Sequence, residues 1–280
     1  MRRDDIDIAA GWRARLELDF ERRGARSVLA GRRHDGPLVV QKALHPEGEG
    51  VCHAIVVHPP AGIAGGDDLG IAVRAGREAH ALLTTPGAGK WYRTAGAWAR
   101  QQVAIAGEPG SCVEWLPQET ILFDGSRADI RLEATLEGDA RLIAWDILCL
   151  ARTGSGERYE RGHARLETRV VRDGRLVWLE RGRLAPGALV LGAGAGLAGH
   201  CVVGTLLAAA GTASDEVLAA CREVPPREGM GAVTRLPGLL VARYLGDEGE
   251  AAREYFAALW HFIRPALAGR EAATPRIWRT

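Results

Sequence analysis

Acidic residues occupy positions in this 280-residue chain where a β-strand pattern predicts apolar side chains. Asp67 falls on the apolar register of the run that follows it, and Asp146 lies within LIAWDILCL at 142–150, which is apolar on both faces. Glu119 and Glu180 alternate in the same way with apolar neighbours. Burying a carboxylate is costly unless it is paired, hydrogen-bonded or bound to a metal. These four acids are therefore the first candidates for chemistry.

The simpler interpretation of each buried acid is an ion pair with an arginine. The chain carries 36 Lys and Arg residues, and only Lys42 and Lys90 are lysines, so arginine partners such as Arg152 and Arg181 are plentiful. For one isolated acid we favour such a pair. Four such acids in one chain favour a shared function, although the sequence does not show whether they converge.

One glycine-rich segment offers an alternative function. GAGLAG at 194–199 matches the dinucleotide-binding pattern GxGxxG, follows an apolar run, and precedes Asp215 at a distance suited to a ribose contact. This would indicate an NAD(P)-binding oxidoreductase. However, no alternation of strands and helices precedes the segment, and the residues after it are poor helix formers. We favour a buried strand, glycine turn and second strand, and titration with NAD or NADP would discriminate.

Two further segments resemble functional patterns less closely. GAGK at 87–90 lacks the first glycine and the final Ser or Thr of a phosphate-binding loop. Residues 188–211 contain no charged side chain and are long enough to span a bilayer, but six glycines and His200 lower their hydrophobicity. We expect a segment buried inside a protein domain and no membrane insertion. The eight histidines form no HExxH pattern, so local spacing supports no stable metal site.

The elements that must position these residues are mostly strands. Period-two alternation dominates up to about residue 185, with turn residues between the runs. Asp173 and Gly174 lie between two apolar runs, which is a strong hairpin signal. No linker or low-complexity tract divides the chain. We therefore predict one β-rich domain over 1–280, a long and mostly antiparallel architecture whose turns account for many of its 36 glycines.

Helices are expected only near the end of the chain. The spacing predicts one helix over 212–223, with Thr212 as its N-cap, and a second over 247–264 that Pro265 terminates. The second helix and the arginine-rich tail at 270–279 form a candidate partner surface. We favour the simpler interpretation that the apolar face of this helix covers the β core.

Composition limits the function classes. The formal net charge is +1, which argues against a general nucleic-acid binder, and 47% hydrophobic residues exclude disorder. The five cysteines are widely spaced, form no CxxC pair, and resemble core residues of a reducing compartment. The first residues, MRRDDID, contain no apolar signal segment. We expect a cytoplasmic protein.

At the same acidic residues the sequence resembles the urease accessory protein UreD family, also called UreH. The longest matching motif is EWLPQETILFDG at 114–125. The other matching segments occur in the same order along the chain as in the family. They are PPAGIAGGD at 59–67, HALLTTP at 80–86, KWYR at 90–93, WDILCL at 145–150, GSGE at 154–157, DGRLVWLER at 173–181 and PRIW at 275–278. The resemblance extends over nearly the whole chain. One departure is Gly89, where the family usually has Ser or Thr.

The resemblance implies a non-enzymatic chaperone in the maturation of nickel urease. UreD proteins bind the urease apoprotein and a UreF-type partner, which in turn carries the GTPase UreG that supplies Ni²⁺. The implied fold is a β-helix-like stack of short strands with helices. The resemblance also implies an internal water-filled route for Ni²⁺, with Asp67, Asp146 and Glu180 at family positions associated with that route. Glu119 joins this set only by its register within the strand.

The chemistry of nickel suits such a route. Nickel is borderline in softness and binds imidazole, thiolate and carboxylate groups. Isolated carboxylates in a wet channel attract a cation by charge while water keeps most of its coordination, and a closed His/Cys site would trap it. We therefore expect no permanently bound cofactor, and Ni²⁺ only in transit past Asp67, Asp146, Glu180 and Glu119.

Overall fold

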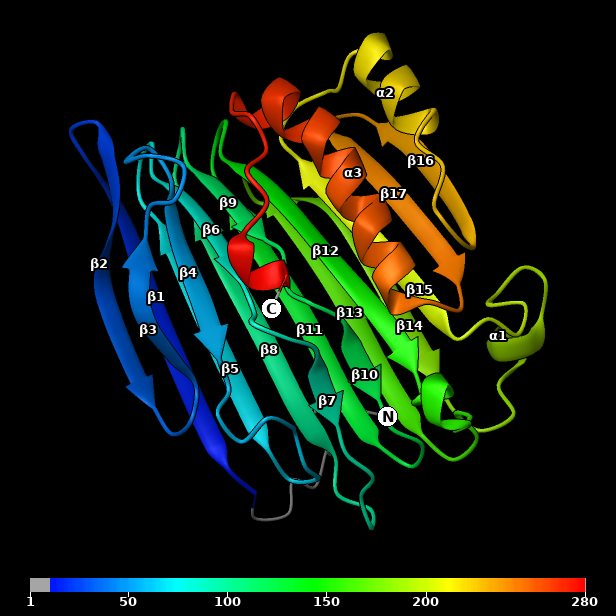
Figure 1. Cartoon of the computed structure of the whole chain (residues 1–280). Coiled ribbons are helices and arrows are strands. Elements are labelled where there is room, and N and C mark those ends of the chain that lie inside the picture. The colour runs from blue at the N-terminus through cyan, green and yellow to red at the C-terminus, as the bar shows by residue number, and fades with distance from the viewer. Residues whose placement is uncertain (1–10, 280) are drawn as a thin grey trace.

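A computed structural model describes residues 11–279, which form two stacked β-sheets with helices on one outer face (Figure 1). The seven-stranded sheet has the order β14-β13-β11-β8-β5-β1-β2. Its strands are β1 (Arg13–Arg23), β2 (Arg26–Asp35), β5 (Asp68–Ala75), β8 (Ala99–Gly107), β11 (Arg127–Leu136), β13 (His163–Arg172) and β14 (Arg175–Leu184).

The ten-stranded sheet has the order β16-β17-β15-β12-β9-β6-β4-β3, with β10 and β7 beside β12. Its strands are β3 (Val39–Leu44), β4 (Cys52–Val57), β6 (His80–Thr84), β7 (Gly89–Trp91), β9 (Cys112–Trp115), β10 (Thr120–Leu122), β12 (Arg141–Leu150), β15 (Val202–Ala209), β16 (Met230–Leu236) and β17 (Leu239–Gly246). The fold is therefore mostly β and solenoid-like, as the sequence and the family resemblance predicted.

The central strands are parallel because the chain alternates between the two sheets. It passes from β4 to β5, from β6 to β8, from β9 to β11 and from β12 to β13, and each new strand pairs in parallel with its counterpart in the previous coil. Antiparallel pairing is confined to the two ends of the stack. The expectation of a mostly antiparallel architecture therefore fits the ends and not the centre.

The turn signals explain this difference. Three glycine-containing turns, at 76–79, 108–111 and 137–140, each connect strands of opposite sheets with four residues, and so form corners and not hairpins. They stack on one another, since the Gly110 N–H donates to Asp139 at 2.7 Å. A hairpin does form at Asp173 and Gly174, where both residues have positive φ (48° and 76°). Local sequence does not distinguish a corner from a hairpin, because both need the same turn residues.

Three α-helices are described: α1 (Leu189–Gly192), α2 (Asp215–Arg222) and α3 (Gly249–Ala268). Helix α2 lies within its predicted range, but Ser214 is the N-cap and accepts from the Val217 N–H at 3.3 Å, so Thr212 as the cap was wrong. Pro265 as the terminator of α3 was also wrong. The helix continues for one further turn because Leu267 and Ala268 are buried, and it ends at Gly269.

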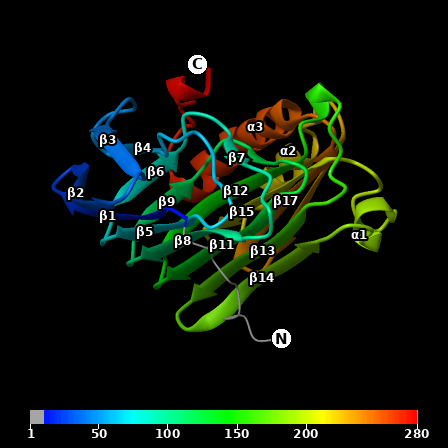
Figure 2. The ribbon, with the colours of Figure 1, turned by 90° about the horizontal axis from the view of Figure 1, so that it is seen from below.

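Two apolar cores fill the structure. They lie between the layers that Figure 2 shows from below. The first lies between the two sheets, and the second lies between the ten-stranded sheet and α3. The apolar face of α3, including Tyr255, Phe256 and Leu259, is buried in the second core, so the helix covers the sheet as predicted. Trp278 in the tail is buried there too, and its indole donates to Thr84 Oγ1 at 2.7 Å.

A buried ion network attaches α3 to the sheet. The Glu114 carboxylate on β9 is fully buried and accepts from Arg264 Nε at 3.0 Å and from the Trp260 indole at 2.7 Å, both on α3. It also pairs with His80 at 2.6 Å. Burial opposes its ionisation, but His80 and Arg264 outweigh this and lower the pKa of Glu114. Arg264 reaches on to Glu47 at 2.6 Å, in the connection between β3 and β4.

None of the helices among residues 11–279 is both long and apolar enough to cross a membrane. The uncharged stretch at 188–211 contains α1, a series of turns, and the buried strand β15. Only Val202–Ala209 lies in the sheet. Most residues from 188 to 200 are exposed, with Leu189 87% exposed, and α1 stands where a first buried strand was expected, so the prediction of a buried segment was wrong for this half.

Substituting Glu114→Ala should destabilise the protein by about 3–5 kcal/mol, because it leaves the Arg264 and His80 charges buried without their partner. Urea denaturation of the two purified proteins measures this difference. The matched control is Glu133→Ala, whose side chain is 58% exposed and should change the stability by less than about 1 kcal/mol. Equal effects of the two substitutions would contradict the importance of the network.

Candidate functional site

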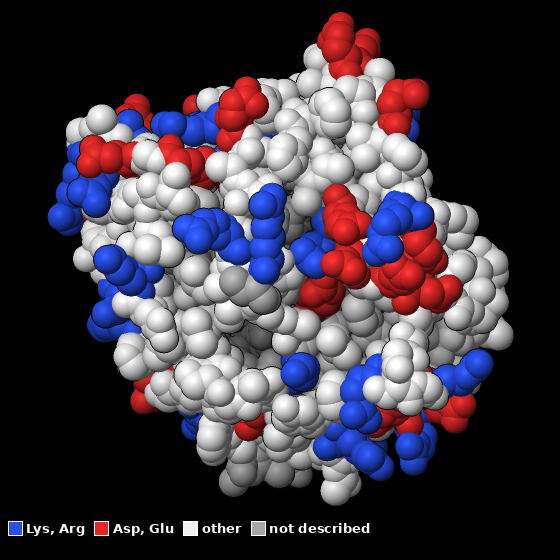
Figure 3. Space-filling view, viewed as in Figure 1, with Lys and Arg blue, Asp and Glu red and all other residues white. Residues whose placement is uncertain are grey.

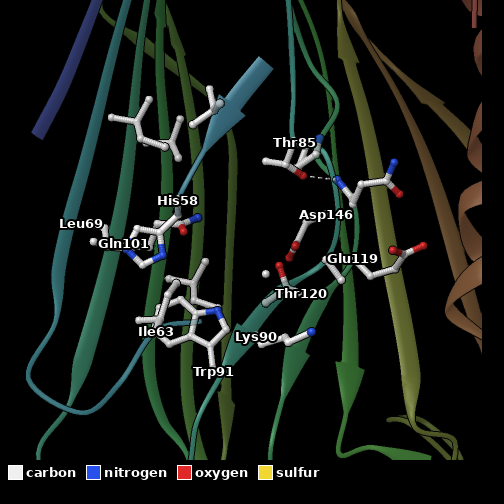
Figure 4. A pocket seen from close by; sticks show the side chains of 18 of the residues that line it. His58, Ile63, Leu69, Thr85, Lys90, Trp91, Gln101, Glu119, Thr120 and Asp146 are labelled. Atoms are coloured by element: carbon white, nitrogen blue, oxygen red, sulfur yellow. Dashed lines mark hydrogen bonds between the residues drawn. The ribbon is translucent and has the colours of Figure 1, made fainter. Parts of the chain in front are cut away.

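A cavity of about 510 Å³ lies between the two sheets, at the end where the long connections gather. Its walls come from both sheets and from the segments that carry the family motifs. Figure 4 shows His58 and Gln101 near one wall and Asp146 and Thr120 near the other. Apolar side chains such as Trp91 complete the lining. Polar groups are thus few and face one another across a mostly apolar space.

Asp146 is the acid that faces this cavity. It alternates along β12 with inward-facing Ala144 and Leu148, and its side chain points into the open space (Figure 4). Within residues 11–279 its carboxylate makes no hydrogen bond or ion pair. Burial and, to a smaller extent, the negative charge of Glu180 together raise the pKa of Asp146 to about 6. An unpartnered acid at such a depth persists because it borders a cavity.

Glu119 lies on the same wall but points the other way. Its stem lines the cavity, while its carboxylate turns toward α3 (Figure 4) and pairs with Arg253 Nε at 2.9 Å. The pair is largely buried, with the two side chains 15% and 20% exposed. Glu119 also borders a second hollow, a surface cleft of about 450 Å³ beside the first residues of α3.

Glu180 lies at the open edge of the sandwich. Its strand β14 ends the seven-stranded sheet, and its carboxylate pairs with Arg243 on β17, across the gap between the sheets. Arg243 also donates to Thr205, which is the cross-strand neighbour of Asp146 on β15. Glu180 is therefore partly exposed and not buried as its register suggested, because edge strand β14 leaves residues such as Leu176 exposed.

Asp67 is buried but does not line the cavity. Its two oxygens accept from the N–H groups of Trp12 (2.9 Å) and Ala64 (2.8 Å), which closes the turn before β5. Its charge acts on His58, which does line the cavity and whose Nε2 has no hydrogen-bond partner among the described residues. Burial lowers the pKa of His58, and Asp67 partly opposes that shift.

The four predicted acids are thus not one cluster. Asp146 faces the cavity, Glu119 and Glu180 flank it in ion pairs, and Asp67 braces a loop beside it. The expected local partners were wrong, since Arg181 pairs with Glu167 and Arg152 with Glu157. Sequence reasoning missed Arg243, Arg253 and His58. Only His58 had a signal, because it directly precedes the matching motif at 59–67.

The dinucleotide-binding interpretation of 194–199 was wrong. The segment forms turns and leads into strand β15, not into a helix. A dinucleotide fingerprint needs a helix N-terminus to hold the pyrophosphate, and none follows here. No group of three or more His, Cys, Asp or Glu side chains within the described part of the chain is arranged to hold a metal ion. All five cysteines are free thiols.

Substituting Asp146→Asn should stabilise the protein in a pH-dependent way. The pKa of Asp146 rises from 3.8 to about 6 on folding, so ionisation costs stability as the pH rises through this interval, and the full cost is present above it. The amide variant should therefore be more stable by an amount on the order of 2 kcal/mol at about pH 8, with little gain near pH 4.

Denaturation midpoints of the wild-type and Asp146→Asn proteins at the two pH values test this expectation. The exposed substitution Glu133→Gln is the control and should show no such trend. A gain that is equal at both pH values would mean that the charge of Asp146 carries no cost.

Comparisons with known proteins cover nearly the whole chain. The family model for the UreD urease accessory protein matches residues 12–279. A protein of Azoarcus sp. (strain BH72) is 58% identical over 270 residues, covering 96% of this chain and 95% of that protein. Relatives from Dechloromonas aromatica and Pseudomonas aeruginosa (strain PAO1) are 52% and 49% identical, over 96% and 99% of this chain and 95% and 98% of their own lengths. All three are named urease accessory protein UreD. The chain belongs to the UreD family of urease accessory proteins.

Proposed function

We propose that this protein assists nickel delivery during urease maturation, and that Asp146 is the central carboxylate of an internal path for Ni²⁺. The observation that carries this proposal is an unpartnered acid facing a cavity between two sheets. A folded protein seldom keeps such a group unless it has a use. The proposed role is that of a chaperone and not of an enzyme, and it is performed in the cytoplasm.

The geometry suits transit better than storage. A hydrated cation in the cavity meets one carboxylate at Asp146 and an imidazole at His58, while water fills its other positions. The other carboxylates of the lining, Glu119 and Glu167, are already paired with Arg253 and Arg181. Apolar side chains such as Trp91 and Leu132 make up much of the remaining wall. Asp146 therefore lowers the cost of bringing a cation between the sheets without binding it tightly.

The proposed partners follow from the family. They are the urease apoprotein, a UreF-type accessory protein, and the GTPase UreG bound through UreF. Charged side chains of both signs gather over the first turns of α3 (Figure 3), where Arg227 pairs with Glu248 and Glu254. The hollow on the same face gives the interior an opening to solvent. A cation carried by a docked partner thus has a short way to Asp146.

Co-expression with urease and the other accessory proteins tests the path. Substituting Asp146→Ala should lower the yield of active urease by about tenfold or more, because a carboxylate that attracts the cation by a few kcal/mol is lost. The same substitution at Glu180 should have a smaller effect, since Arg243 already neutralises that acid. Urease activity and nickel content per active site are the measurements.

The control is Glu133→Ala on the outer face of the seven-stranded sheet, and co-purification with the partner proteins is checked for every variant. Normal urease activation by Asp146→Ala would rule out Asp146 as part of the path. Loss of activation together with loss of the complex would mean that Asp146 acts through folding or assembly and not through nickel transfer.

A further inference from the structure

A surface cleft lies on the far side of the wall that carries Asp146. Its lining includes Cys149, Cys201, Asp247 and Arg253, and Glu119 belongs both to this cleft and to the internal cavity. Glu119 is therefore a residue that the solvent-facing hollow and the space between the sheets share. The carboxylate of Glu119 turns to the cleft side, where Arg253 holds it.

The first turn of α3 packs closely against the Glu119 side chain. Gly249 is the first residue of α3, and a Cβ at that position would lie 2.9 Å from the Cys149 thiol and 3.2 Å from Glu119 Cγ. The Glu119 side chain, the Cys149 thiol and the helix start are thus packed together. Cys149 is paired across the sheet with Val202, on the side of β12 that faces away from Asp146.

We infer that this cleft is a vestibule for a hydrated divalent cation, which reaches the internal cavity by replacing Arg253 at the Glu119 carboxylate. The inference rests on the proposed nickel path and adds to it an entry or exit point and a residue that controls it. Arg253 keeps Glu119 paired while no cation is present, so the carboxylate is never left buried and unpaired.

The exchange is favourable on charge grounds. The guanidinium carries one positive charge and a divalent cation carries two, and both are attracted by the same carboxylate. Among the other acids that line the cleft, Asp247 pairs with His200 and accepts from the Cys201 N–H, and Glu250 lies 3.7 Å from Arg253. Glu119 is the acid of the cleft that also lines the internal cavity, so the exchange is placed there.

The reactivity of Cys149 reports on occupation of the vestibule. In a Cys201→Ala background, Cys149 is the one cysteine of the full-length protein that is not buried. Its reaction rate with neutral methyl methanethiosulfonate is measured by mass spectrometry over a series of NiCl₂ concentrations. The ratio of the rates with and without Ni²⁺ is compared within each variant, which cancels direct effects of a substitution on the thiol.

Ni²⁺ should slow the modification of Cys149 in the wild-type protein. Arg253→Met should lower the half-protecting Ni²⁺ concentration by about tenfold, because the competing guanidinium is gone. Glu119→Gln should abolish the protection, and Arg253→Lys should restore behaviour close to wild type. The matched control is Arg235→Met, which removes an arginine whose ion-pair partner Asp215 does not line the cleft, and it should change nothing.

Protection that survives Glu119→Gln, or a half-protecting concentration that Arg253→Met leaves unchanged, would overturn the inference, and so would the absence of any protection. Thermal denaturation of each variant confirms that it is folded. The Cys149 protection experiment can fail while the urease activation experiment on Asp146 succeeds, so the two proposals are tested separately. Impaired urease activation by Asp146→Ala, with no Glu119-dependent protection of Cys149, means that the path exists but does not use this vestibule.

Discussion

The ion network at Glu114 is the interaction on which the position of the other functional elements depends. A carboxylate with no exposed surface on β9 holds Arg264 and Trp260, and through them the whole length of α3, against the ten-stranded sheet. Because α3 is fixed at this point, its first turn is also fixed, and there Arg253 meets Glu119. Removing one member of a buried charge network is far more costly than removing a surface pair, so the helix has one defined location.

The acids near the cavity differ in how their charge is compensated. Glu119 and Glu180 each have an arginine from a distant element, whereas Asp146 between them has none. Because Asp146 has no positive partner, ionising its buried carboxyl is unfavourable, and its pKa is raised. A cation beside the carboxylate would favour the ionised form. Of these three acids, the one without an arginine partner thus lies between the two that have one.

Alternation and turn residues were sufficient to predict a β-rich fold, the hairpin at Asp173 and Gly174, and the apolar face of α3. They were insufficient to predict which strands pair, because a four-residue corner and a four-residue hairpin need the same residues. The register of the apolar runs led to Asp146 and Glu119. Arg253 lies 134 residues from Glu119, and no local pattern connects two residues at that separation. Three-dimensional packing alone brings them together.

The connections at the two ends of the strands differ in how well they can tolerate a change of length. At one end, each coil passes from one sheet to the other through a turn of four residues. Neighbouring turns are hydrogen-bonded to each other, as Gly110 is to Asp139, so an inserted residue would disturb these bonds. At the other end the connections are long, contain the short strands β7 and β10, and form the cavity. Length changes during evolution should therefore accumulate at the cavity end, where they alter the shape of the opening without disturbing the register of the strands. The strand register and the shape of the cavity opening thus depend on different segments of the chain.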